Sequence, residues 1–461
     1  MVLRSTTDIV NALVAKGVLT EEEGALLNKG REGEAAGQAK ALKKASKLSV
    51  SDAIDNAKIY GDIRARYERR NIDVATTSAA TDGQNSESNR SRYKFTFGVE
   101  TKAGDWYTDL AFAASSNGRS DNVTFGDGGI GATASTATPT VGTDKGMSPK
   151  DKGAVYVKRA MIGWNPTSWL AVEAGRMKNP LYMVNSMVFD HDIVMEGVQE
   201  KLNYKIGETN LFANMGQWAY TGGGVQALNG VTTGRQNLIL AFQAGAEQAF
   251  SDRLSSKAAV GYYNYTSNSK STTGYVPTVG NGTAVKSEGV NDLAILDVLG
   301  EANYMVTSNI GVRPYAEYAY NTLGSERQAT ACALATGTCG LAKDDSAWLV
   351  GVSVGSAKDL KSFASKKMVA GDWSANLWYQ SVGTYALDQN SVDTDIFDGR
   401  VNMEGTTLKA QYNVQDNVAL NFTGAWGDRK NAQYGTNYVK ADIDSNGTKF
   451  ELYQFDVTYK F

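Results

Sequence analysis

The chain of 461 residues has no run of about 18 apolar residues, so no segment is long enough to cross a membrane as a helix. Its formal charge is only -3, which argues against a nucleic-acid-binding protein, because such proteins carry a basic excess or a basic patch. Its single histidine, His191, has no nucleophile motif around it, which argues against an enzyme. The triplet Asp190-His191-Asp192 is too short a pattern to predict a metal site. We therefore expect no catalytic residue, no metal and no cofactor.

Cysteine is also scarce, and the only two are Cys332 and Cys339. They lie close together in a polar stretch. A disulfide that closes a short loop would suit an oxidising compartment. Two reduced thiols in a loop fit the sequence as well, so the pattern leaves the redox state of the pair open.

Residues 1–56 differ in composition from the rest of the chain, and they lack the charged and apolar regions of an export signal. Apolar residues such as Leu13 recur at helical spacing, and Thr20 with Glu23 forms a capping-box pair. We predict a short helical segment over residues 6–47. A coiled coil, a tether and a plug are alternative roles for this segment, and a partly ordered leader is the alternative without a role.

From residue 58 onward the apolar pattern has a period of two. In residues 59–68, odd-numbered positions are apolar, small or aromatic, and even-numbered positions are polar. The same alternation recurs in residues 92–100 and 106–113, and it predicts strands with one face toward lipid and one toward water. The chain ends in an alternating aromatic face, formed by Tyr453, Phe455, Val457, Tyr459 and Phe461.

The connections between these segments alternate between long and short, which is typical of transmembrane β-barrels. A long polar stretch at 70–88 is followed by a short one at 102–105. Further tight turns are predicted near 165–168, 206–209, 251–254, 306–309 and 414–417, with a longer turn at 357–372. Long loops are predicted near 116–153, 177–195, 220–236, 266–289, 322–345, 383–398 and 428–445.

These patterns predict an all-β fold, a transmembrane antiparallel β-barrel of about 16 strands over residues 57–461, preceded by the short N-terminal helical segment. Four tryptophans beside predicted short turns suit an aromatic girdle at the membrane boundary. The alternative is a soluble β-protein with these rings in its core, but few other folds close so many strands around an apolar exterior. The four are Trp106, Trp164, Trp169 and Trp373.

Three parts of the sequence resemble the "putative porin" family of Gram-negative outer membranes. They are the aromatic terminal strand, the segments 3–8 and 17–20, and the loop with 175–180 and 189–192. The resemblance spans the whole chain and implies export, with the signal peptide removed, to an outer membrane of lipid and lipopolysaccharide. It also implies passive diffusion of small hydrophilic solutes, but no particular substrate. Barrels of this size usually form homotrimers, with a monomer as the alternative, and residues 6–47 would then be placed for a cell-wall contact.

The loop near 177–195 is unusually apolar for an outer loop. Met183, Met187 and Phe189 would be costly in water, and they fit a segment packed against the inner barrel wall. In trimeric porins the corresponding loop folds into the lumen and narrows it. A hydrophobic subunit contact or a folded surface loop is the alternative.

Charged residues are predicted on both sides of this constriction. The loop carries Asp190, Asp192 and Glu196, and strand alternation turns a basic set toward the lumen. Opposed charges across a narrow channel set up a transverse field that orients dipolar solutes and influences ion preference. The predicted pore-lining basic residues are Arg64, Arg66, Arg92, Lys94, Arg159, Arg176 and Lys178.

Three other functions compete with a diffusion channel. A structural or tethering barrel without an open channel is the main alternative, and the helical segment favours it. An electron conduit would need a haem protein, and the chain has no Cys-x-x-Cys-His motif. A lipid-modifying enzyme would depend on His191. An anion-selective channel is left open, because acidic residues such as Asp62 and Glu68 share the lumen face with the arginines.

Overall fold

The computed structural model describes most of the chain after residue 53, and the structural statements below concern only the described residues. The predicted helical segment at 6–47 lies outside them, apart from the isolated positions 14, 16, 20 and 22. The chain divides into two units, residues 1–58 with 101–104 and residues 59–100 with 105–461, and the second contains nearly all of the sheet. The remaining described residues are 54, 56–74, 86–115, 121–125, 154–221, 226–228, 231–233, 237–266, 292–334, 344–359, 369–388, 391–393, 395–397, 401–431 and 447–461.

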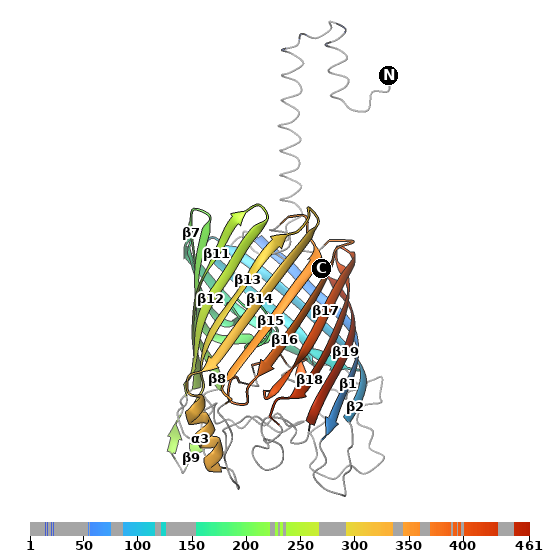
Figure 1. Ribbon diagram of the computed structural model, residues 1–461. Helices are drawn as coiled ribbons and strands as arrows, with labels where there is room; N and C mark the ends of the chain where they lie inside the picture. Colours follow the sequence, from blue (N-terminus) through green and yellow to red (C-terminus); the bar gives the residue numbers. More distant parts are fainter. Residues whose placement is uncertain are drawn as a thin grey trace. The chain divides into compact units, whose positions relative to one another are not determined.

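Sixteen long antiparallel strands form a closed barrel, in which the last strand pairs with the first (Figure 1). The predicted all-β barrel of about 16 strands is therefore confirmed. The strands are β1 (Asn56–Val74), β2 (Ser86–Ala103), β3 (Trp106–Ser115), β5 (Ala154–Thr167), β6 (Leu170–Lys178), β7 (Val194–Ile206), β8 (Thr209–Thr221), β11 (Asn237–Ser251), β12 (Leu254–Tyr265), β13 (Ala294–Met305), β14 (Ile310–Asn321), β15 (Ser346–Ser356), β16 (Trp373–Val382), β17 (Met403–Gln415), β18 (Val418–Arg429) and β19 (Gly447–Lys460).

Three short strands and a helix lie in the long connections. Strand β4 (Asn122–Thr124) pairs with three residues of β2, and β9 (Gln226–Leu228) pairs with β10 (Val231–Thr233). Helix α3 (Gly324–Leu334) lies between β14 and β15. Within the described part of the chain, no helix is long and apolar enough to span a membrane.

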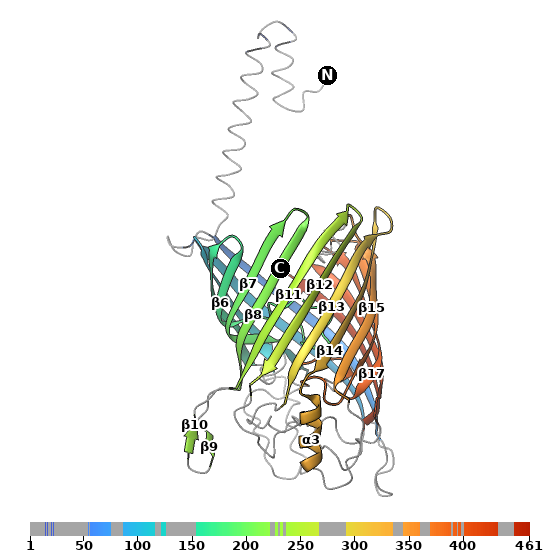
Figure 2. The ribbon, with the colours of Figure 1, turned by 60° about the vertical axis from the view of Figure 1, so that its left-hand side comes forward.

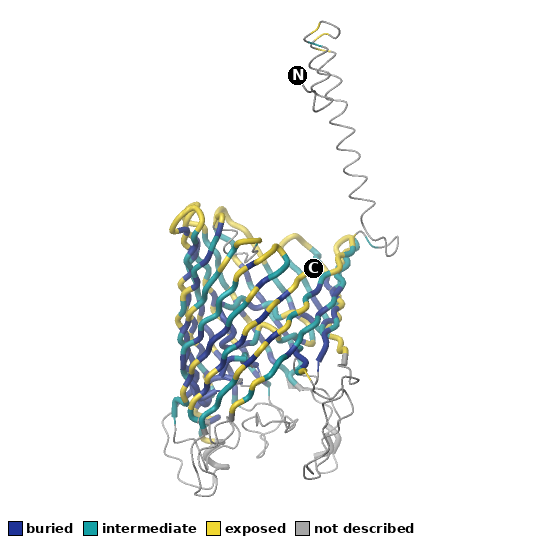
Figure 3. The backbone as a smooth tube through the Cα atoms, turned by 90° about the vertical axis from the view of Figure 1, so that its right-hand side faces the viewer, coloured by how far each residue is buried: buried dark blue, intermediate teal, exposed yellow. Residues whose placement is uncertain are grey.

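The period of two in the sequence becomes an alternation of exposed and buried residues along each strand (Figure 3). On β1, Ile63 and Tyr67 are about half exposed on the outer face, whereas Arg66 and Glu68 on the inner face are buried. On β1 the outer face is therefore apolar and the inner face polar. This arrangement fits a wall between lipid and a polar interior.

The connections follow the predicted order of long and short. The predicted short turns join β2 to β3, β5 to β6, β7 to β8, β11 to β12, β13 to β14 and β17 to β18, and the longer turn joins β15 to β16. In Figures 1 and 2 these turns lie at the upper end of the barrel, and α3 lies at the opposite end. Because the number of strands is even, the start of β1 and the end of β19 both lie on the short-turn side of the barrel.

The predicted aromatic girdle lies at the short-turn end. Trp106 and Trp164 are paired across β3 and β5, and their rings stack with centroids 5.7 Å apart. They and the remaining two, Trp169 and Trp373, are exposed on the outer face. Amphipathic rings in this position suit the membrane–water boundary.

The final residue takes part in closing the barrel. The backbone amide of Gly61 donates to the Phe461 carbonyl at 3.0 Å, and the amide of Phe461 donates back at 3.1 Å. A Cβ at Gly61 would lie 2.4 Å from the carbonyl oxygen of Thr96 and 2.5 Å from the Phe461 ring. This close approach explains why β1 carries a glycine opposite the terminal aromatic residue.

Candidate functional site

The barrel encloses a cavity of about 930 Å³ that is lined by strands and by two of the long loops. The lining extends from Lys460, next to the short-turn end, to Asp393 in the loop between β16 and β17. Charged side chains of both signs contribute to it. The basic ones are Arg64, Arg66, Lys94, Lys158, Arg176, Arg313, Lys409 and Lys460, and the acidic ones are Asp62, Asp121, Asp190, Asp192, Asp393, Asp395 and Asp456.

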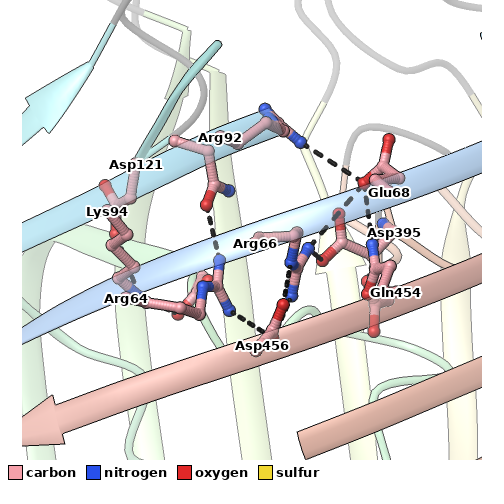
Figure 4. Close-up of polar contacts among 12 residues, drawn as sticks. Arg64, Arg66, Glu68, Arg92, Lys94, Asp121, Asp395, Gln454 and Asp456 are labelled. Atoms are coloured by element: carbon pink, nitrogen blue, oxygen red, sulfur yellow. Dashed lines mark hydrogen bonds and ion pairs between the residues drawn. The ribbon is translucent and has the colours of Figure 1, made fainter. Parts of the chain in front are cut away.

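A basic wall, which we define as Arg64, Arg66, Lys94 and Lys158, lies on β1, β2 and β5. Figure 4 shows Arg64, Arg66 and Lys94 of this wall. The Arg66 Nε lies 2.7 Å from Asp456 Oδ1, and Arg64 Nη1 lies 3.7 Å from Asp456 Oδ2. Because β1 and β19 are neighbours, barrel closure brings these groups together.

Glu68 lies at the centre of an arginine cluster and is fully buried. The Nε of Arg90 donates to its carboxylate at 2.7 Å, and Gln454 Nε2 donates at 2.9 Å. Three more guanidinium groups lie within 3.9 Å of the same carboxylate. One acid therefore offsets several nearby positive charges, which come from Arg66, Arg70, Arg90 and Arg92.

Lys158 belongs to the basic wall although simple alternation places it on the outer face. The pairing of β3 with β5 skips this residue, since Ala111 pairs with Arg159 and Phe112 pairs with Val157. Such a β-bulge turns two consecutive side chains toward the same face. As a result Lys158 bonds Asp121, and Arg159 bonds Asp109. The sequence carries no signal for the bulge, so Lys158 was missed.

The first loop, residues 179–193, packs its apolar side chains on residues of the inner wall. The rings of Phe189 and Tyr263 meet edge to face at 5.1 Å. The backbone amide of Tyr182 donates to Gln243 Oε1 at 2.7 Å, and Asn185 Nδ2 donates to the Tyr315 hydroxyl at 3.3 Å. The buried residues are Leu181, Val184, Met187, Val188 and Phe189.

The described residues of a second long loop, 383–402, make similar contacts. The sequence predicted a long loop near 383–398, but we did not predict that it packs on the inner wall. The Phe397 ring packs edge to face on Phe450 at 5.8 Å. The two loops also touch, because the amide of Asp190 donates to the Ser391 carbonyl at 2.7 Å. The apolar residues within this polar stretch were the sequence signal that could have indicated its packing on the wall. Those that are buried are Tyr385, Leu387, Val392, Ile396, Phe397 and Val401.

Phe397 sits in a socket made by two glycines. It has a positive φ of 48°, which is costly for an aromatic residue and has to be held by packing. Gly405 and Gly427 are paired on β17 and β18, and a Cβ at Gly427 would lie 2.5 Å from the Phe397 ring.

We expect Gly427→Ala to displace this ring and to destabilise the protein by about 1–3 kcal/mol, as overpacking usually does. Unfolding by urea, together with protease cleavage within residues 383–402, measures the effect. Gly300→Ala is the matched control, because a Cβ there makes only an ordinary contact at 3.4 Å. If the two variants are equally stable and are cleaved equally, the packing of Phe397 against Gly427 does not hold this loop in place.

The acidic groups of the two loops differ in their charge state. Burial, and then the neighbouring charge of Asp393, raise the pKa of Asp190 to about 7. Burial also raises the pKa of Asp393. Burial acts in the same direction on Asp395, but Arg66, with Nη1 only 2.7 Å from its Oδ2, holds the pKa of Asp395 well below its usual range. Loop acids beside the basic wall therefore stay charged, whereas Asp190 titrates near neutrality.

The predicted site residues fall into two groups. Arg64, Arg66, Lys94, Arg176, Asp190 and Asp192 line the cavity, and Lys94 Nζ lies 3.5 Å from Asp192 Oδ1. The others lie elsewhere. Arg92 is buried beside Glu68, Arg159 bonds Asp109, and Lys178 lies 3.6 Å from Glu100 and from Asp109.

Glu196 is not a loop residue. It lies on β7, where it forms an ion pair with Arg176 at the loop end of β6. Our placement of Glu196 in the loop assumed that β7 began later in the chain than it does.

His191 lines the cavity, and its Nδ1 contacts the hydroxyl of Ser186. Among the described residues, no group of three or more His, Cys, Asp or Glu side chains could hold a metal ion. The proposed pair of Cys332 and Cys339 is not described, because Cys339 and the Cys332 side chain lie outside the described residues.

Solved structures that match this chain include outer-membrane proteins of low sequence identity. The outer membrane channel DcaP of Acinetobacter baumannii is 14% identical, with 89% of this chain and 99% of that chain covered and a TM-score of 0.40. OprB of Pseudomonas putida is 11% identical, with 88% and 94% covered and a TM-score of 0.47. OmpF of Salmonella typhi is 11% identical, with 90% and 100% covered and a TM-score of 0.42.

The sequence itself matches one family. No curated protein matches the chain. The family described as "Putative porin" matches residues 37–294, which is more than half of the chain, and the barrel and its charged interior agree with that description. The chain therefore belongs to the "Putative porin" family of outer-membrane β-barrels.

Proposed function

We propose that this protein is a porin that allows passive diffusion of small hydrophilic solutes and ions through a water-filled lumen narrowed by inserted loops. One observation carries the proposal. The polar cavity reaches from the two loops to the short-turn end of the barrel, and charged side chains line it throughout. A sealed barrel has no need for so much hydrated charge along its axis.

The narrow part of the lumen lies where both loops meet the basic wall. The loops are joined at Asp190 and Ser391, and Asp192 and Asp395 reach across to Lys94 and Arg66. Acidic groups on the loops and basic groups on the strands then face the same passage. Such opposed charges create a transverse field that orients dipolar solutes.

The charges that line the cavity nearly balance, with the eight basic and seven acidic side chains named above. A lining of this kind admits ions of both signs and favours polar solutes over apolar ones. We also propose a homotrimer embedded in lipid and lipopolysaccharide, because barrels of this size commonly assemble as trimers.

Single-channel recording in a planar bilayer tests the proposal. Purified, folded protein should give current steps in multiples of three, with a weak reversal potential under a salt gradient. Glu87→Gln is the control variant, because its ion pair with Arg69 is exposed at the outer rim and should not alter the current. Folded protein without conductance would overturn the channel and leave a structural or tethering barrel.

A further inference from the structure

The outer wall formed by β6, β7 and β8 carries polar side chains, Glu200 and Gln217, in the middle of its strands. Figure 2 shows these strands side by side with β11. Glu173 and Gln199 are buried and therefore lie on the inner face of this wall. Glu173 accepts hydrogen bonds from Tyr107, Gln199 and Lys201, so Lys201 lies on the inner face as well. Because side chains alternate along a strand, Glu200, between Gln199 and Lys201, points outward.

The strand register gives the outward neighbours of Glu200. It pairs with Val172 on β6 and with Met215 on β8, and Val198 on the same face is 39% exposed. Gln217, which pairs with Val198, donates through Nε2 to Glu200 Oε2 at 3.4 Å. Glu200 and Gln217 therefore form a polar contact on the outer surface of the barrel.

Glu200 lies well inside the apolar belt rather than at its edge. The Trp169 carbonyl accepts from the amide of Asn203, so the aromatic girdle reaches β7 beside Tyr204. Glu200 is four residues further along the strand. With a rise of about 3.3 Å per residue and a tilt of about 40°, it lies roughly 10 Å into a belt about 25 Å tall.

A carboxylate at this depth has no partner in lipid, because hydrocarbon offers neither water nor hydrogen-bond donors. On the opposite side of the barrel the outward positions are apolar, as at Val298, Val350 and Leu377. The polar stripe continues toward the loop end through Glu196, which strand alternation places on the same face of β7 as Val198 and Glu200. Lipid headgroups reach that end of the stripe but do not reach Glu200.

We propose that the outer face of β6–β8, around Glu200 and Gln217, is the contact surface for a second copy of this chain. The face holds donors and acceptors side by side, so the same face of another copy can satisfy it around a symmetry axis. Burial between barrels removes Glu200 from lipid and supplies the hydrogen bonds that lipid lacks. The inference rests on the proposed outer-membrane channel and adds which wall is shared.

Heating of the SDS-resistant oligomer tests the inference. Glu200→Leu should lose the oligomer band at a lower temperature than the wild type, since a partner group loses its acceptor. Glu451→Leu is the matched control, because this exposed residue lies at the loop end of β19, and the variant should behave as the wild type. If Glu200 faces lipid instead, Glu200→Leu will leave the oligomer unchanged and will stabilise the barrel. That result would overturn the inference.

A second measurement leaves Glu200 in place. A nitroxide label at Val198→Cys should show little access to oxygen in lipid vesicles, whereas a label at Val350→Cys should show full access. Both variants carry Cys332→Ser and Cys339→Ser so that only the new thiol reacts. Equal oxygen access at the two sites would overturn the inference. Conductance recorded on the same samples separates this result from a failure of the channel proposal.

Discussion

Replacing Glu68 with glutamine is expected to lower the free energy of unfolding by about 3–5 kcal/mol, the usual cost of removing one partner from a buried ionic cluster. Glu68 is fully buried, and four arginines lie around its carboxylate, of which Arg66 is also paired with Asp395 and Asp456. Glutamine keeps the size of the side chain but removes the charge. The four arginines then repel one another in a site from which water is largely excluded.

Urea unfolding in lipid vesicles, followed by tryptophan fluorescence, measures this effect. Glu87→Gln is the matched control, because Glu87 and Arg69 are both about half exposed and such surface pairs contribute only about 0–1 kcal/mol. A loss at Glu68 as small as that at Glu87 would show that Asp395 and Asp456 already neutralise the cluster. Selectivity toward anions should also rise in Glu68→Gln.

The cation preference of the channel is expected to increase as the pH rises through about 7, the pKa of Asp190. Below this pH the carboxyl is neutral, and above it a negative charge is added to the lining of the cavity, at the place where we propose that the lumen is narrow. The groups that face it are Asp192, Asp393 and Asp395, with the basic wall beyond them. Each additional negative charge there attracts cations and repels anions.

The reversal potential under a salt gradient, recorded well below and well above pH 7, measures this change. Asp190→Asn should remove most of the pH dependence and hold the channel at its low-pH selectivity. A wild-type reversal potential that is independent of pH would contradict the raised pKa of Asp190.

The same titration affects stability with a defined sign. The folded protein keeps the Asp190 proton up to a pKa of about 7, whereas the unfolded chain releases it at the ordinary pKa of an aspartate. The free energy of unfolding therefore falls as the pH rises between these two pKa values. It then levels off above about 7. Asp190→Asn should flatten this part of the stability profile.

Strand positions and loop lengths could be predicted from the sequence because they depend on local periodicity. A face that meets lipid must be apolar at every second residue, so each strand carries its own signal, and β1 with its alternating Ile63 and Arg64 is an example. The aromatic girdle was predictable for a similar reason, since the tryptophans lie directly beside short turns.

The charged interior could be predicted only in part. Alternation gives the face of a side chain but not its depth or its partner, and so Arg64 and Arg92 are equivalent in the sequence. In the structure Arg64 lines the cavity and Arg92 is buried beside Glu68. Lys158 and Glu196 were missed or misplaced because a bulge and a strand boundary, neither visible in the sequence, set their positions.

The partners of the charges depend on barrel closure and on loop packing. Glu68 and Gln454 are 386 positions apart in the sequence, and they meet because β1 pairs with β19. The second loop is held by Phe397 in a socket of glycines from two strands, which no local pattern indicates. Membrane solvation acts on each strand separately, and therefore the local pattern specified the barrel. Charge pairing acts between distant strands and loops, and therefore only the tertiary structure decided the arrangement of the lumen.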